Sequence, residues 1–279
     1  MPTYSTPEPI QAVVEFAVGE ARISASDRGD TVVEVRPSDA NHDADVQAAE
    51  RTRVEFVAGR LEVKGPKQRR PFGKAGSIDV TVALPTGSRL SGTSGMGTFR
   101  SEGQLGNSRL STGAGDILLA GTGTLDANSG VGAVTVEEVD GTADVSTGSG
   151  RIRLGAVSGN AEIKNSNGDT WVGEVRGDLR VKSANGSVDV DRAQGGVEAT
   201  TANGALRVGG LTKGSASLKT ALGAVEIGIA DGTAAQLDLH TTLGTVRNQM
   251  EVTDRPDPAD QVVEVYARTG YGDITIRRS

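Results

Sequence analysis

Residues 143–152 read Ala143-Asp144-Val145-Ser146-Thr147-Gly148-Ser149-Gly150-Arg151-Ile152, and variants of this stretch recur along most of the chain. In each variant, a glycine ends a turn of small residues and is followed by alternating polar and apolar residues. Successive glycines of this kind are separated by 18, 17, 18, 18, 18, 18, 19, 21 and 28 residues. A period close to 18 residues indicates a stack of repeated units. The glycines are Gly97, Gly115, Gly132, Gly150, Gly168, Gly186, Gly204, Gly223, Gly244 and Gly272.

Apolar residues occupy fixed positions within the repeat. Two and four residues after the glycine, most units carry Val, Ile or Leu, and a second apolar column lies five residues before it. Such alternation is typical of a strand with one buried face. No segment has the spacing of a crossover helix. The pattern therefore predicts an all-β fold, a single-stranded β-solenoid (β-helix) of about ten 18-residue rungs over residues 88–279.

The turns of the repeat are rich in short polar side chains. Three residues before each glycine stands Ser, Thr or Asn, as at Thr112, Asn165 and Thr220. We interpret this column as structural, because such side chains bond backbone groups at turns and each other along a stack. The residues directly before three of the glycines are expected to adopt positive φ angles. They are Asn167, Asn185 and Asn203.

The first 87 residues do not follow the period and are predicted to form an irregular β cap on the solenoid, continuous with it. Strands are expected at residues 10–16, 21–24, 31–35 and 77–84, a hairpin at residues 53–63 and a short helix at residues 43–51. Residues 250–261, which contain two prolines, read as a loop before the final rung. That rung, residues 274–279, has no obvious cap.

Charge and composition exclude several classes of protein. The chain carries 29 Lys and Arg against 36 Asp and Glu, a net charge of −7, so no general attraction to nucleic acid is expected. It contains no cysteine, which excludes disulfides and thiolate chemistry. The N-terminus lacks the features of a secretion signal, and no stretch approaches the roughly 20 apolar residues of a membrane span. These features predict a cytoplasmic protein. One basic run, at residues 64–74, is interpreted as a solvated loop, with contact to an anionic surface as the alternative.

No catalytic, metal-binding or cofactor-binding pattern emerges from the repeat. Aspartate follows only three of the ten glycines, Asp116, Asp169 and Asp273, and never in adjacent rungs, so shared calcium sites are not expected. The outward residues Asp189, Arg207, Glu226 and Arg247 alternate in sign, as stacked pairs do. The two histidines lie in unrelated regions. We therefore predict a protein that is not an enzyme and has no metal or cofactor.

Trp171 is the candidate binding residue. It is the only tryptophan, and its place in the alternation points it outward between Arg153 and Asp189. The structural interpretation is stacking against the Arg153 guanidinium. The functional interpretation is a hot spot for a partner, made of Trp171, Arg153 and Asp189.

The rungs resemble the putative-adhesin, or toast-rack, family of β-strand-repeat proteins. The stretch at residues 143–152 carries the resemblance, as does Leu179-Arg180-Val181-Lys182-Ser183-Ala184-Asn185-Gly186-Ser187-Val188. The resemblance implies a non-catalytic bacterial domain, often found with membrane-associated envelope-stress sensors or regulators.

Together these observations predict an interaction or scaffold protein that binds a protein partner, in an envelope-stress or regulatory complex. The alternative is a self-assembling structural β-solenoid similar to the bactofilins, which associates through its C-terminal rung. A polysaccharide-active enzyme is the third hypothesis, disfavoured because the chain has few aromatic residues for a saccharide cleft.

Overall fold

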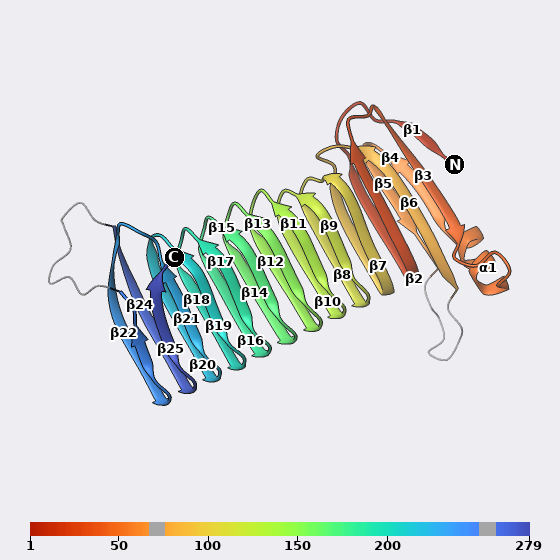
Figure 1. Cartoon of the computed structure of the whole chain (residues 1–279). Coiled ribbons are helices and arrows are strands. Elements are labelled where there is room, and N and C mark those ends of the chain that lie inside the picture. The colour runs from red at the N-terminus through yellow and green to blue at the C-terminus, as the bar shows by residue number, and fades with distance from the viewer. Residues whose placement is uncertain (67–75, 251–260) are drawn as a thin grey trace. The chain divides into compact units, whose positions relative to one another are not determined.

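A computed structural model describes residues 1–66, 76–250 and 261–279, which form two compact units, residues 1–140 and 141–279. The described residues contain strands β1 to β25 and one helix, α1, which confirms the predicted all-β solenoid. Each rung places one strand before a turn glycine and one after it (Figure 1). The predicted boundary near residue 87 stays a prediction.

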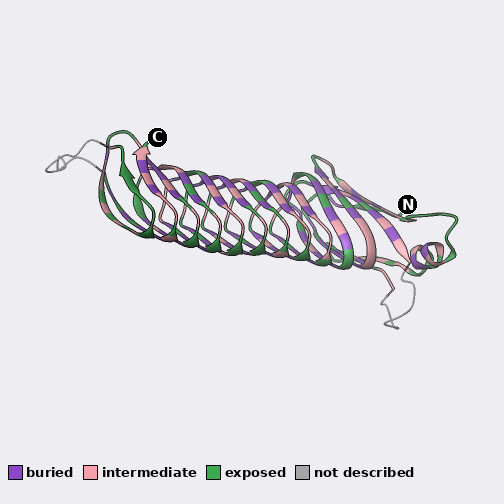
Figure 2. Cartoon of the chain, turned by 60° about the horizontal axis from the view of Figure 1, so that its bottom comes forward, coloured by how far each residue is buried: buried purple, intermediate pink, exposed green. Residues whose placement is uncertain are grey.

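The second unit consists of rungs whose strands pair in parallel with those of the neighbouring rungs. Val188 lies beside Thr170 on one side and Leu206 on the other, at the same place in each rung. Along most of these strands, buried inward residues alternate with outward residues that are partly or fully exposed (Figure 2). The strands are β12 (Ala143–Ser149), β13 (Ile152–Val157), β14 (Ala161–Asn167), β15 (Thr170–Val175), β16 (Leu179–Asn185), β17 (Val188–Ala193), β18 (Val197–Asn203), β19 (Leu206–Leu211), β20 (Gly214–Leu222), β21 (Val225–Ile229), β22 (Thr233–Leu243), β23 (Val246–Asn248), β24 (Gln261–Tyr271) and β25 (Ile274–Arg278).

The last two rungs of this unit are exchanged relative to their order in the sequence. Strands β24 and β25 pair with β20 and β21 on one side and with β22 and β23 on the other. The amide of Gly223 donates to Tyr271, and the amide of Gly272 donates to Leu243. The prediction that residues 274–279 form the terminal rung is therefore wrong, because β22 and β23 occupy that place.

Burial explains why this order is favourable. The inward residues Val263, Val265 and Ile274 of the inserted rung are completely buried, whereas Leu237 and Leu239 of β22 are only partly buried. The exchange places inside the stack the rung that has Ile274 and Ile276 where the end rung has Val246 and Asn248.

The first unit contains similar rungs and an antiparallel end. Strand β2 pairs in parallel with β7 and with both β5 and β6, so residues 11–26 form one long strand rather than the two that were expected. Beyond β5 and β6, the strands β4, β3 and β1 pair antiparallel, which confirms the predicted hairpin. The elements are β1 (Thr3–Ser5), β2 (Gln11–Ser26), β3 (Asp30–Pro37), α1 (Asp43–Arg51), β4 (Arg53–Val57), β5 (Arg60–Lys64), β6 (Ser77–Pro85), β7 (Arg89–Gln104), β8 (Ser108–Ala114), β9 (Ile117–Thr122), β10 (Leu125–Val131) and β11 (Val134–Val139).

Helix α1, at the predicted residues, is fixed by one buried carboxylate. Asp45 accepts a hydrogen bond from the Ser77 amide at 2.9 Å and another from His42 Nδ1 at 2.9 Å. These bonds, the one from the Ser77 backbone first, lower the pKa of Asp45, so it stays ionised and holds the helix against β6.

The polar turn column has the structural role that was expected of it. Thr112 donates to the carbonyl of Gly97 at 2.9 Å in the first unit, and Thr220 donates to that of Gly204 at 3.0 Å in the second. Asn165 interrupts the pattern, because its amide donates to both Gly150 and Gly168. Ser183, the next residue in the column, would otherwise donate a hydrogen bond to the carbonyl oxygen of Gly168. Its hydroxyl and the Asn165 Oδ1 are buried without a partner among the described residues.

The expectation of positive φ at Asn167, Asn185 and Asn203 is wrong. Among the described residues, the only non-glycine residue with a positive φ is Ala58. The glycine that follows each asparagine takes this conformation instead, as Gly186 does with φ 133°. The asparagine side chains form an exposed ladder, in which Asn185 donates to Asn167 at 2.9 Å and Asn203 donates to Asn185 at 2.8 Å.

The break in the turn column yields a prediction about stability. We expect Thr220→Val to lower the free energy of unfolding by about 1 kcal/mol, because it removes a buried hydrogen bond. Ser183→Ala removes a hydroxyl that has no partner, and we expect almost no change. Urea unfolding followed by circular dichroism compares the two variants. Equal losses would show that the column does not stabilise the stack through these bonds.

The exchanged order of the last rungs is testable by cross-linking, since the chain has no cysteine of its own. Leu222 and Tyr271 lie in adjacent strands, about 4.8 Å apart at the backbone, whereas Leu222 and Leu243 are two strands apart, about 9.6 Å. We expect Leu222→Cys with Tyr271→Cys to form a disulfide under mild oxidation, and Leu222→Cys with Leu243→Cys to form none. The reverse result on non-reducing gels would show that the last rungs are stacked in their sequence order.

Candidate partner-binding surfaces

Trp171 lies on the outer face of β15, partly exposed, directly beside Arg153 of β13. The Arg153 guanidinium carbon lies 4.0 Å from the centroid of the indole ring. This confirms the predicted stacking of a cation on an aromatic face. The side chains of both residues remain accessible to a partner, with Arg153 the more exposed.

Glycines form the floor beside the indole. A Cβ at Gly173 would overlap the carbonyl oxygen of Gly155 and come within 2.9 Å of Trp171 Cη2. A side chain at this position is therefore excluded, and the indole lies against bare backbone. Trp171 and the stacked Arg153 guanidinium form an aromatic platform on the outer face, with one edge of the indole beside the Gly173 backbone.

Asp189 is beside Trp171 in register but is turned to a different partner. Its carboxylate accepts a bond from Arg207 at 3.2 Å, and Arg207 also lies 3.9 Å from Glu226. The structure thus brings Arg153 and Trp171 together and leaves Asp189 in a ladder of exposed ion pairs. Arg247, expected to extend this ladder, lies instead in the terminal rung and pairs with Asp273 at 3.4 Å. Exposed pairs of this kind contribute little to stability, about 0–1 kcal/mol each.

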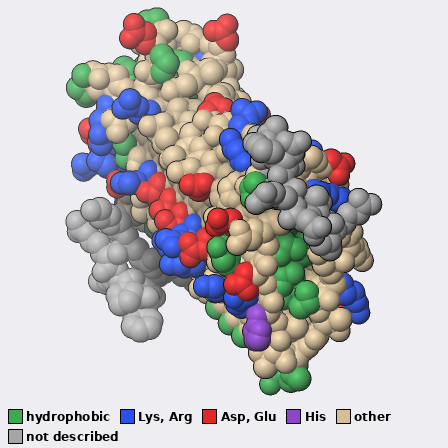
Figure 3. Space-filling view, turned by 90° about the vertical axis from the view of Figure 1, so that its left-hand side faces the viewer, with side chains coloured by type: hydrophobic (Ala, Val, Ile, Leu, Met, Phe, Trp, Pro, Cys, Tyr) green, Lys and Arg blue, Asp and Glu red, His purple; other side chains and the backbone are tan. Residues whose placement is uncertain are grey.

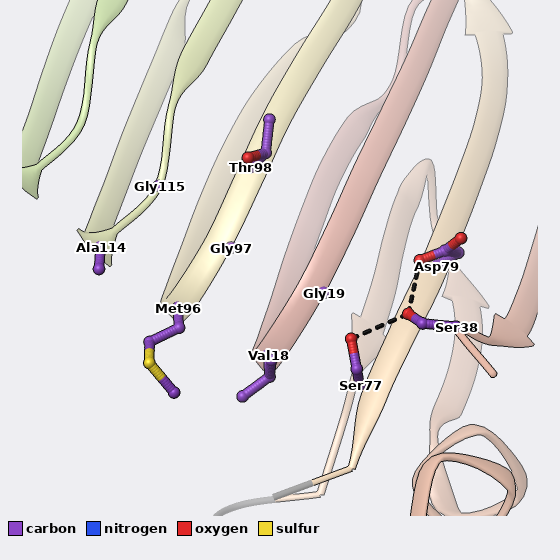
Figure 4. Close-up of a pocket in the computed structure, with 10 residues that line it drawn as sticks. All are labelled: Val18, Gly19, Ser38, Ser77, Asp79, Met96, Gly97, Thr98, Ala114 and Gly115. Carbon is purple, nitrogen blue, oxygen red and sulfur yellow. Dashed lines mark hydrogen bonds between the residues drawn. The ribbon is translucent and has the colours of Figure 1, made fainter. Parts of the chain in front are cut away.

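A second surface, a depression of about 480 Å³, lies in the first unit where the turns of several rungs meet. Val18 and Met96 project from neighbouring strands on one side of it (Figure 4). On the other side Ser38 is bonded to Ser77 at 2.8 Å and donates to Asp79 at 2.7 Å. The described lining contains no histidine, lysine or cysteine, so these hydroxyls have no general base other than a carboxylate that is already bonded. The depression offers apolar contact and hydrogen bonds.

Exposed apolar side chains also follow the turn edge of the second unit. Leu222, Tyr271 and Leu243 are neighbours in three successive strands and are 48%, 59% and 60% exposed. They occupy the position directly before the turn glycine, where the asparagine ladder stands in earlier rungs. The sequence signal for this apolar patch is the residue directly before the turn glycine, which changes from asparagine to Leu or Tyr in the last three rungs.

The carboxylates of the turns have structural partners. Asp169 accepts a bond from the Ser187 amide at 3.0 Å, and Asp273 accepts one from the Thr245 amide at 2.8 Å. No group of three His, Asp or Glu side chains that could hold a metal is found within residues 1–66, 76–250 and 261–279. In the same part of the chain, no helix has the length and apolar character to cross a bilayer. Most of the basic run, residues 67–74, lies outside the described residues.

Comparisons with known proteins give similarities to solved structures at low sequence identity. Neither a family model nor a curated protein matches the chain. A solved structure of a putative adhesin from Parabacteroides merdae is 10% identical, with a TM-score of 0.42 and coverage of 100% of this chain and 95% of its own. A putative adhesin from Bacteroides fragilis is 15% identical, with a TM-score of 0.32 and coverage of 99% and 95%. A protein from Parabacteroides distasonis, described as a putative lipid binding protein, is 10% identical, with a TM-score of 0.34 and coverage of 100% and 95%.

At these identities and scores, no residue, ligand or activity is transferred from these proteins to this chain.

Proposed function

We propose that this chain is a non-catalytic binding protein whose outer face, centred on Trp171 and Arg153, contacts a protein partner. The observation that carries the proposal is the partly exposed indole of Trp171 with the Arg153 guanidinium stacked on its face, 4.0 Å from the ring centroid. Trp and Arg are enriched among residues that dominate binding energy, and a rigid aromatic loses little entropy when it is covered.

The surrounding surface supports a protein partner of mixed polarity. The ion pair of Asp189 with Arg207 lies at the rim of the platform, where charges set orientation more than affinity. A role in envelope-stress or regulatory complexes and a cytoplasmic location are the finer parts of this proposal, and they rest on the family resemblance and the composition.

A self-assembling, bactofilin-like solenoid is the alternative, favoured by the partly buried leucines of β22. Growth of a head-to-tail filament requires two open parallel ends. The first unit ends in antiparallel strands β4, β3 and β1, with α1 packed against β3 and β6. This end counts against a filament built by continuing the parallel stack.

The proposal is tested by capturing partners of the tagged full chain from its native cells and then measuring binding of the purified partner. We expect Trp171→Ala to weaken binding at least about tenfold, the loss typical of a central aromatic contact. The thermal unfolding midpoint should change little, because the indole lies on the outer face.

Lys182→Ala is the matched control. Lys182 is exposed on β16, a strand that precedes a turn glycine, whereas the strand of Trp171 follows one. This variant should bind the partner as the original chain does. Unchanged affinity of the Trp171 variant would remove this face from the binding site. Capture of the chain alone would favour self-assembly.

A further inference from the structure

The second unit ends in a rung that has a partner on one side only. Strands β22 and β23 pair with β24 and β25, and no other described strand pairs with them. Their inward residues are therefore only partly buried. Leu237 and Leu239 are partly exposed and Val246 is 42% exposed, whereas Val265 and Ala267 in the adjacent strand are completely buried.

Such an edge is a template for another strand. It is eleven residues long and contains no proline, and no charged residue stands in its inward column, so it lacks the usual features that prevent pairing. Hydrophobic side chains are visible among charged ones on this end of the unit (Figure 3). Its outward charges are few and are placed close together, with Asp238 and His240 two residues apart on the same face.

We propose that a second copy of this chain covers the end, with β22 pairing antiparallel with its own counterpart about a two-fold axis at Leu239. Such a pair buries the inward leucines of both copies against each other. It goes beyond the proposed binding of a protein partner and does not depend on it.

Charge complementarity selects this register. With the axis at Leu239, Asp238 of each copy stands opposite His240 of the other, so two favourable cross-strand pairs form at once. An axis at Asp238 would oppose two carboxylates, and an axis at His240 would oppose two imidazoles. Moving the axis by one residue in either direction therefore loses both pairs.

The groups that face these side chains are compatible with the pairing. Asp238 lies beside Tyr266, and His240 lies beside Arg268, on the inner strand β24. Arg268 donates to Asp238 at 2.6 Å, and this bond lowers the pKa of the Asp238 carboxyl, which stays ionised at neutral pH. The imidazole donates to that carboxylate from the open side in either protonation state.

The two-fold arrangement predicts a closed dimer rather than a fibre, because the same strand is used once by each copy. Sedimentation equilibrium of the purified full chain over a wide concentration range gives the dimer dissociation constant. His240→Asp places a carboxylate opposite Asp238 of the other copy at both cross-strand positions. We expect it to raise the dimer dissociation constant about tenfold.

The exchange of both residues, Asp238→His with His240→Asp, is the decisive variant. It rebuilds both pairs in the same register and should return the dissociation constant to within about threefold of the original, an outcome that a folding defect does not give. A monomer at all concentrations, an assembly larger than a dimer, or a dimer unaffected by His240→Asp would overturn the proposal.

Cross-linking tests the register directly in this cysteine-free chain. Leu239→Cys lies on the proposed axis and should form a disulfide between two copies under mild oxidation. Thr242→Cys is the control. Two such residues would lie about 20 Å apart in the proposed register, so no disulfide should form. Cross-linking at residue 242 but not at residue 239 would exclude the register.

Discussion

The close approach of turn glycines in successive rungs is the constraint on which the rest of the structure depends. A Cβ at Gly186 would overlap the carbonyl oxygen of Gly168, and the same holds between Gly204 and Gly186. Only glycine permits this contact at positive φ, so the contact fixes the register of each rung on the one before it. Once the register is fixed, every position of the repeat becomes a column. Apolar columns merge into a continuous core, and polar columns become ladders of hydrogen bonds or ion pairs.

This constraint also determines where binding can occur. The interior is filled mainly by Val, Ile and Leu, and turn hydroxyls such as those of Thr112 and Thr220 are bonded to glycine carbonyls. What varies freely from rung to rung is the outward residue. Trp171 takes such a position, and Gly155 and Gly173 beside it leave the backbone bare. The proposed binding surface is therefore an exception within an outward column.

The columns could be predicted from the sequence, and the order of the rungs could not. Periodicity places Val225 and Ile274 in the same column, and the Arg153–Trp171 stack follows from the same count. The position of a residue within the repeat does not show which rungs are adjacent in the stack. The rungs of Gly272 and Gly244 both follow the alternation, although Asn248 stands in one where Ile276 stands in the other, so both orders satisfy the pattern. The longer spacings of 21 and 28 residues mark an irregular end without giving its path. The asparagine φ angles were mispredicted because glycine, the next residue, adopts that conformation at lower cost.

The exchanged order changes which chemistry lies at the open end. In sequential order the open end would be β24 and β25, whose outward charges are Glu264, Arg268 and the arginines of β25. The exchanged order instead presents β22, where one carboxylate and one imidazole lie two residues apart around Leu239. A strand with this arrangement is complementary to itself only when it is reversed. The same exchange that completes the burial of the C-terminal rung therefore places β22, the strand of the proposed antiparallel pair, at the open end.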